Sequence, residues 1–409
     1  MVTRVQQNWK YIIITMLFLG WSLGNFDRFI MNYAVLGISK DLHFSASETG
    51  IVLSSFFAGY AIMQIPGGWL ADRFGFRKII ITALLAWSIF TVLTGFAWSL
   101  LSMILIRFLF GIGEGSFFPS ASKGIAGWFP INERSRAMSI MLSSGTIMGV
   151  LTPIVGTHLI QGIGWRSIFH SVGVIGIVIT LLFVFLLKEQ TRTNVDGEKT
   201  SSKKKQPLKE VLKTPMIWNL FIAYFSIYAV NWGLTSWMPT YLVKVKGLDL
   251  TSVGYVSAIP PLAGVLAMFL SGYVLDKLPE GKDKFLAAVS AIISAGSLLL
   301  MAFAPSITMF VIYQSIITVL FSFNIILITT VPLKILPEDV VGTANGFINT
   351  GAQFAGVLTP MLIGFLVDAF NGSYNAAFIM LVMFALLCAG SLFTIRQKKQ
   401  IELTSQHVG

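Results

Sequence analysis

Long apolar runs separated by short polar segments dominate the pattern of this chain. A helix needs about 20 mostly apolar residues to cross the hydrocarbon core of a bilayer. Runs of that length occur at residues 11–36, 48–71, 79–98, 101–125, 137–160, 167–187, 216–243, 251–275, 285–304, 307–333, 341–368 and 374–395. The pattern therefore predicts an all-α membrane protein with twelve transmembrane helices.

The two halves of the chain repeat each other. The segment GWLADR at Gly68–Arg73 returns 204 residues later as GYVLDK at Gly272–Lys277. The string GVLTP occurs at Gly149–Pro153 and again 207 residues later at Gly356–Pro360. Transporters use parallel repeats of this kind, with the substrate site between the halves. We therefore expect two six-helix bundles at 1–187 and 216–409, the second ending in a short cytoplasmic tail, joined by a cytoplasmic linker at 188–215.

Composition and charge support a membrane protein and orient it. Charged residues make up 11% of the chain, against about 25% in soluble proteins. With both termini in the cytoplasm, 23 Lys and Arg residues fall on the cytoplasmic side of the predicted spans and 4 on the outside. The positive-inside rule therefore predicts a multi-pass protein of the plasma membrane with both termini cytoplasmic. This distribution also accounts for the net charge of +11 without a nucleic-acid partner.

Four charges lie inside the predicted spans and away from their ends. Asp27 and Arg28 are adjacent in the first span, while Arg107 and Glu114 are seven residues apart in the fourth. Two helical turns take about 7.2 residues, so Arg107 and Glu114 share one helix face. An unpaired charge inside a bilayer costs about 2.5–3.5 kcal/mol on insertion scales, so such residues are candidates for function. The predicted topology brings the four charges to similar depth.

Two interpretations of these charges are open. In the first, they form two salt bridges that only lock the first half. In the second, Asp27 and Glu114 bind protons near neutral pH, since burial disfavours a charged carboxylate. Arginine offers a carboxylate two parallel hydrogen bonds. We therefore expect Arg28 to bind a substrate carboxylate and Arg107 to act mainly on Glu114.

Polar and aromatic side chains supply further candidates for substrate binding. In the seventh span, Tyr224, Tyr228 and Trp232 are spaced at i, i+4 and i+8. In the eleventh span, Asn345, Asn349 and Gln353 have the same spacing. Interhelical hydrogen bonds or ordinary packing are the alternative interpretation. The candidates are Asn32, Tyr60, Tyr224, Tyr228, Asn231, Trp232, Asn349 and Gln353.

One segment carries a family resemblance. GGWLADRFGFRK at Gly67–Lys78 resembles the loop signature between the second and third helices of the major facilitator superfamily. Asp72 and the basic residues of such a loop can cap helix ends and pair across the cytoplasmic face. We therefore expect a gating and structural role, rather than substrate binding, for Gly68, Asp72, Arg73 and Arg77.

A narrower resemblance is to the anion:cation symporter branch, which includes bacterial sugar-acid/proton symporters and the sialin and vesicular glutamate carriers. The resemblance rests on FDRFIMNYAV, RFLFGIGEGSFFPS, GWFPINERSRAM and GWRSIF. It implies that Asp27 and Glu114 are protonation sites. It also implies that Arg28 and Arg107 serve anion binding or charge pairing.

The function expected from these features is proton-coupled symport of a small organic anion by alternating access. A sugar acid is favoured, such as a hexuronate, aldonate or aldarate. Nucleotide-loop and HExxH motifs are absent, and Cys388 is the single cysteine, so we expect no cofactor, no metal and no enzyme activity. We expect the protein to work as a monomer in the lipid bilayer. The alternatives are a proton-driven drug exporter and a symporter of a non-sugar carboxylate.

Overall fold

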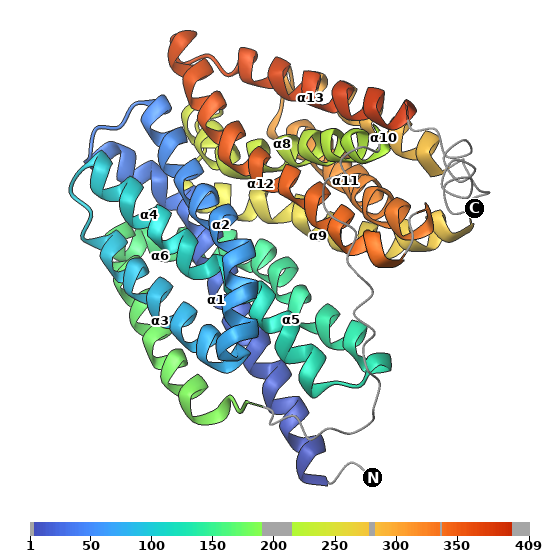
Figure 1. The fold of residues 1–409 in the computed structure, drawn as a ribbon. Helices are drawn as coiled ribbons and strands as arrows, with labels where there is room; N and C mark the ends of the chain where they lie inside the picture. Colours follow the sequence, from blue (N-terminus) through green and yellow to red (C-terminus); the bar gives the residue numbers. More distant parts are fainter. Residues whose placement is uncertain (1–3, 190–214, 278–282, 336–337, 395–409) are drawn as a thin grey trace. The chain divides into compact units, whose positions relative to one another are not determined.

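The computed structural model describes residues 4–189, 215–277, 283–335 and 338–394. Every regular element in these ranges is a helix (Figure 1). The elements are α1 (Arg4–Asp41), α2 (Ala46–Phe74), α3 (Phe76–Gly95), α4 (Leu100–Gly115), α5 (Phe117–Trp128), α6 (Ile131–Leu186), α8 (Pro215–Lys244), α9 (Leu250–Lys277), α10 (Asp283–Ala302), α11 (Ile307–Ile335), α12 (Glu338–Ala369) and α13 (Asn375–Phe393). Most of the predicted linker, 190–214, and the tail 395–409 lie outside the described residues.

Length and composition make ten of the described helical segments apolar enough to cross a membrane. One of them, α6, is 56 residues long and contains two predicted spans. Gly164 interrupts it with a positive φ of 77°, which glycine adopts without the steric penalty of a side chain. The 38-residue α1 covers the first predicted span and carries Asp27 and Arg28. Each predicted span thus falls on a described helix, and the predicted all-α membrane fold is confirmed.

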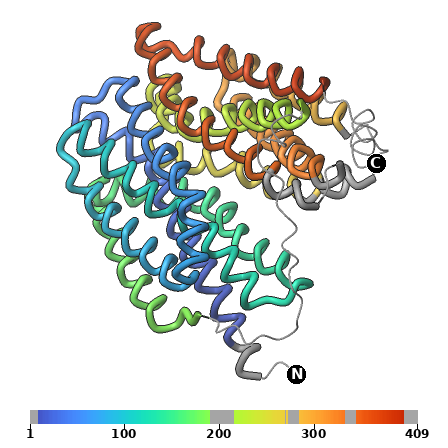
Figure 2. The backbone as a smooth tube through the Cα atoms, viewed as in Figure 1, coloured from blue at the N-terminus to red at the C-terminus, as the bar shows by residue number. Residues whose placement is uncertain are grey.

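The described residues form two compact units. The first contains α1 to α6 together with Ser236–Ala258 and Pro360–Asp368, and the second contains α10, α11, α13 and the remaining described residues. In the first unit α1 packs along α6, α2 along α4, and α3 along both α4 and α6 (Figure 2). In the second, α10 packs against α11 and α13 around a core of alanine and aliphatic side chains. The bundle boundaries expected from the sequence stay a prediction.

The repeated GVLTP string makes equivalent contacts inside the first unit. A Cβ added to Gly50 would lie 2.5 Å from the carbonyl oxygen of Pro360. A Cβ added to Gly254 would lie 2.5 Å from the carbonyl oxygen of Pro153. Gly50 and Gly254 are themselves 204 residues apart, the spacing of the repeated GWLADR segment. The internal repeat of the sequence is therefore matched by a repeated backbone contact.

Glycine also brings α2 and α4 into direct backbone contact. A Cβ on Gly59 of α2 would lie 2.0 Å from the carbonyl oxygen of Phe108, and one on Gly111 of α4 would lie 2.2 Å from that of Phe56. Small residues at such crossings let membrane helices approach closely. Because Arg107 and Glu114 belong to α4, this crossing helps to set the position of both charges.

The crossing predicts a large effect of one methyl group at Gly111. The variant Gly111→Ala should lower stability by about 1–3 kcal/mol, because its Cβ forces the two backbones apart. Gly390→Ala is the matched control, since no atom lies within 4 Å of a Cβ at this exposed site in α13. Thermal unfolding in detergent, followed by loss of the monodisperse chromatographic peak, measures both variants. Equal midpoints for the two variants would contradict this packing.

Candidate functional site

Two ion pairs join α1 to α4. Arg107 Nη1 lies 3.2 Å from Asp27 Oδ1, and Arg28 Nη2 pairs with Glu114 Oε1. The sequence suggested that Arg107 would act mainly on Glu114, but its ion pair is with Asp27. Residues seven apart in a helix are about 10 Å apart along its axis, which is too far for direct contact. Each charge of α4 instead reaches across to α1.

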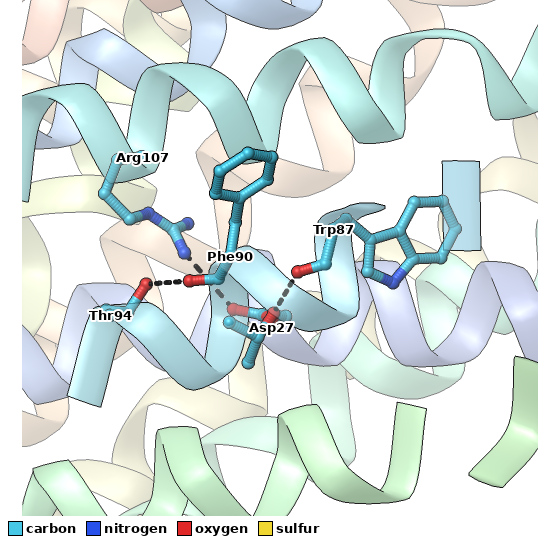
Figure 3. Close-up of polar contacts among 6 residues, drawn as sticks. Asp27, Trp87, Phe90, Thr94 and Arg107 are labelled. Atoms are coloured by element: carbon cyan, nitrogen blue, oxygen red, sulfur yellow. Dashed lines mark hydrogen bonds and ion pairs between the residues drawn. The ribbon is translucent and has the colours of Figure 1, made fainter. Parts of the chain in front are cut away.

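Asp27 is enclosed by α3 and α4. Its residue surface is 1% exposed. The Thr91 hydroxyl of α3 donates a hydrogen bond to Asp27 Oδ2, while Arg107 of α4 donates to Oδ1. Figure 3 shows Arg107 directed toward Asp27, with Trp87 and Thr94 nearby. Each carboxylate oxygen of Asp27 therefore has its own donor.

Arg28 is the more accessible of the two arginines. Its side chain is 13% exposed, against 2% for Arg107 and 0% for Glu114. Its guanidinium group lies over the rings of Phe56 and Tyr60, with centroids 4.9 and 5.1 Å away. Such cation–π contacts hold an arginine without neutralising it. Of the four charges, Arg28 is thus the most exposed, while its partner Glu114 is fully buried.

Unused hydrogen-bonding groups remain at this pair. Arg28 Nε and Glu114 Oε2 are both buried and have no hydrogen-bond partner among the described protein groups. Buried polar atoms in proteins usually have partners, so unpaired ones at a site call for an explanation. A bound anion would supply an acceptor for Arg28, and a proton would neutralise the Glu114 carboxylate.

Local features of α1 and α2 position this pair. Gly24 lies one turn before Arg28, and a Cβ there would come within 3.3 Å of Glu114 Oε1, so glycine makes room for the carboxylate. Tyr60 of α2 is buried, with its ring against the Arg28 guanidinium group. Asn32, one turn beyond Arg28, is 8% exposed.

Sequence reasoning missed Thr91, a polar residue within a predicted span. Ser and Thr side chains in apolar helices commonly bond to their own backbone. The residue type and spacing of Thr91 therefore did not distinguish it from other polar residues of the spans.

The aromatic candidates of α8 form one face in the second unit. The Tyr224 hydroxyl donates to the Tyr228 hydroxyl at 3.4 Å, and their ring centroids lie 4.7 Å apart. The Tyr228 ring also packs 6.1 Å from Trp232 and 5.3 Å from Phe321, a partner on α11. The predicted i, i+4, i+8 stripe is present as a contact chain.

The remaining amide candidates differ in exposure. Asn231 and Gln353 are partly buried, whereas Asn349 is exposed on α12. Their roles in substrate binding stay predictions, as do those of the aromatic face.

The candidate gating residues fasten helix ends in the first unit. Lys123 of α5 pairs with Asp72 at 3.1 Å and donates to the Ala71 carbonyl near the end of α2. Arg77 donates to the carbonyl oxygens of Val184, at 2.6 Å, and Leu187 at the end of α6. These contacts agree with the expected capping of helix ends, while the gating role stays a prediction.

The other two members of this set make local contacts. Arg73 lies over the rings of Trp69 and Phe74. A Cβ on Gly68 would contact only Pro119, at 3.6 Å. No cluster of three potential metal ligands occurs in the part of the chain that the structure describes.

Known proteins resemble this chain in sequence over most of its length. The family model described as Major Facilitator Superfamily matches residues 12–360. The probable sulfoacetate transporter SauU of Cupriavidus necator is 31% identical, covering 94% of this chain and 93% of SauU. The probable galactarate/D-glucarate transporter GarP of Escherichia coli K12 is 30% identical, covering 96% of both chains. These similarities extend over nearly the whole chain.

A solved structure supports the fold. A bacterial homologue of the human lysosomal transporter Spinster matches with a TM-score of 0.84 and 22% identity. The match covers 94% of this chain and 96% of the homologue. The similarity at this identity concerns the fold alone.

The buried ion pair between Asp27 and Arg107 predicts that Arg107→Met strongly lowers the stability of the protein. Removing one partner of a buried ion pair typically costs about 3–5 kcal/mol. Arg166→Met is the control, because Arg166 pairs with Asp41 where both side chains are more than 40% exposed, and exposed pairs contribute about 0–1 kcal/mol. Denaturant unfolding in mixed micelles compares the two. The loss in Arg107→Met should shrink as the pH falls, since a protonated Asp27 needs no cation; a pH-independent loss would contradict this explanation.

Proposed function

Because this chain belongs to the Major Facilitator Superfamily and is related to transporters of sugar acids and other anions, we propose that it imports a small organic anion together with protons. It is a membrane transporter and not an enzyme. Import would proceed by alternating access, in the plasma membrane, with both termini in the cytoplasm and the monomer as the working unit. The charge distribution over the predicted loops supports this orientation.

The observation that carries the proposal is the ion pair between the partly exposed Arg28 and the buried Glu114. A substrate carboxylate that binds Arg28 competes with Glu114 for the same guanidinium group. A displaced Glu114 carboxylate would remain buried without its cation, which strongly favours protonation. Conversely, a proton on Glu114 releases Arg28 for the anion. Each ligand thereby promotes binding of the other, as thermodynamic linkage requires.

Asp27 is the second proton-coupling acid in this proposal. It is sealed between Arg107 and Thr91, so it is placed to hold a proton but not to contact the anion. One proton per monovalent anion makes transport electroneutral. A second proton adds one net positive charge, and an interior-negative potential of 100 mV favours its entry by about 2.3 kcal/mol.

The proposed substrate is a sugar acid such as an aldarate, hexuronate or aldonate. GarP is described as a carrier of galactarate and D-glucarate, which supports this class. Tyr224, Tyr228, Trp232, Asn349 and Gln353 remain candidates for substrate binding in this proposal, because rings and amide groups suit a polyhydroxylated ligand. SauU, described as a sulfoacetate carrier, keeps a small non-sugar carboxylate as the second candidate. Export of cationic drugs is disfavoured because Arg28 would repel them.

Uptake into proteoliposomes tests the function. An inward proton gradient should drive accumulation of one or more of labelled D-glucarate, D-glucuronate, D-gluconate and sulfoacetate, and a protonophore should abolish it. Liposomes without protein are the control. Absence of gradient-driven uptake of all four anions, combined with efflux of a cationic dye, would overturn the proposal.

Glu114→Gln tests the coupling step. This variant mimics the protonated acid, so gradient-driven accumulation should fall to the background of empty liposomes, while exchange of internal for external substrate should persist. Glu133→Gln is the matched control, since Glu133 also forms an ion pair, with Lys10, but its side chain is 46% exposed. Accumulation by Glu114→Gln at the wild-type level would remove Glu114 from the coupling mechanism.

A further inference from the structure

Thr91 of α3 has more acceptors than it has hydrogens to donate. Its hydroxyl carries one hydrogen. Two acceptors are within reach: Asp27 Oδ2, and the carbonyl oxygen of Trp87 at 2.9 Å. Only one of these bonds can form at a time with that hydrogen. Thr91 is 1% exposed, so its hydroxyl is shielded from bulk water.

Thr94, one turn further along α3, shows the ordinary arrangement. Its hydroxyl donates to the carbonyl oxygen of Phe90 at 2.9 Å, the same backbone bond that Thr91 can make to Trp87. Thr94 is as deeply buried as Thr91, at 0% exposure. In their hydrogen bonds, the two threonines therefore differ in that Thr91 also faces Asp27.

We propose that Thr91 is a positioning residue that satisfies Asp27 in both of its protonation states. When Asp27 is ionised, the Thr91 hydroxyl donates to Oδ2. When a proton binds Oδ2, the new carboxylic O–H donates to Thr91 Oγ, and the Thr91 hydrogen turns to the Trp87 carbonyl. Thr91 gains and loses no proton in this exchange, since only the direction of one hydrogen bond is reversed.

The other charged groups around Asp27 keep their partners during this exchange. From α4, Arg107 stays on Oδ1, and Glu114 acts from a greater distance. On α1, the adjacent Arg28 is held by Glu114. From α3, the facing polar group is the Thr91 hydroxyl itself. The reversal is therefore confined to Thr91, Asp27 and the Trp87 carbonyl.

This inference deepens the proposed function, because it rests on Asp27 being a proton-coupling acid. Valine in place of Thr91 keeps the shape of the side chain but supplies neither donor nor acceptor. The ionised state then loses a hydrogen bond to a charge, and the protonated state loses a weaker neutral one. The protonated state is hence favoured, and the titration of Asp27 in Thr91→Val should move to higher pH by about 1 unit.

Infrared difference spectroscopy of the purified protein measures this without a substrate. The signal is the carbonyl stretch of the protonated Asp27 carboxyl group, identified as the band that Asp27→Asn removes. In Thr91→Val the band should appear at higher pH and at higher frequency, as expected for a carboxylic acid whose O–H has lost its acceptor. Thr91→Ser, which retains the hydroxyl, should restore the wild-type titration and frequency.

Thr94→Val is the matched control. It removes the same type of backbone hydrogen bond from the same helix but should leave both the titration and the frequency at wild-type values. Thermal unfolding of the two valine variants reports the stability change that they share. If the band of Thr91→Val coincides with that of Thr94→Val, or if the wild type shows no band that Asp27→Asn removes, the inference is overturned. Failure of the proposed function would appear separately, as absence of anion uptake by the wild type.

Discussion

The four charges on α1 and α4 can be buried because each forms an ion pair with a residue of opposite charge on the other helix. Asp27 and Arg28 of α1 pair with Arg107 and Glu114 of α4, and an isolated charge at such depth would be costly. Three glycines of the first unit support this pairing. Gly59 and Gly111 bring α2 and α4 into backbone contact, and Gly24 leaves room for the Glu114 carboxylate.

The two pairs have different environments, and this difference separates their chemistry. Asp27 and Arg107 are closed in, and each oxygen of Asp27 has a donor. Arg28 is partly exposed above aromatic rings, and its pair with Glu114 retains unpaired polar atoms. An anion can compete for the second pair but not for the first. Under the proposed function, substrate binding and proton storage are thereby divided between Arg28 and Asp27, which are neighbours on one helix.

The backbone contacts between helices are repeated in the two halves of the sequence, whereas the charges within the spans are not. The repeat produces equivalent contacts, with Gly50 against Pro360 and Gly254 against Pro153. The charges that lie within the predicted spans and away from their ends, in contrast, all belong to the first half of the sequence. Backbone packing can be duplicated because it depends on small residues and helix geometry alone. The second half instead carries the aromatic and amide candidates.

The sequence by itself determined the features that depend on local periodicity. Apolar runs of about 20 residues specified the spans, the repeated strings indicated two related halves, and a spacing of seven placed Arg107 and Glu114 on one face. Only the tertiary structure decided that Arg107 pairs with Asp27 and that Thr91 differs from Thr94. The physical reason is that helical spacing sets which residues share a face, whereas the partner of each side chain depends on which neighbouring helix packs across from it.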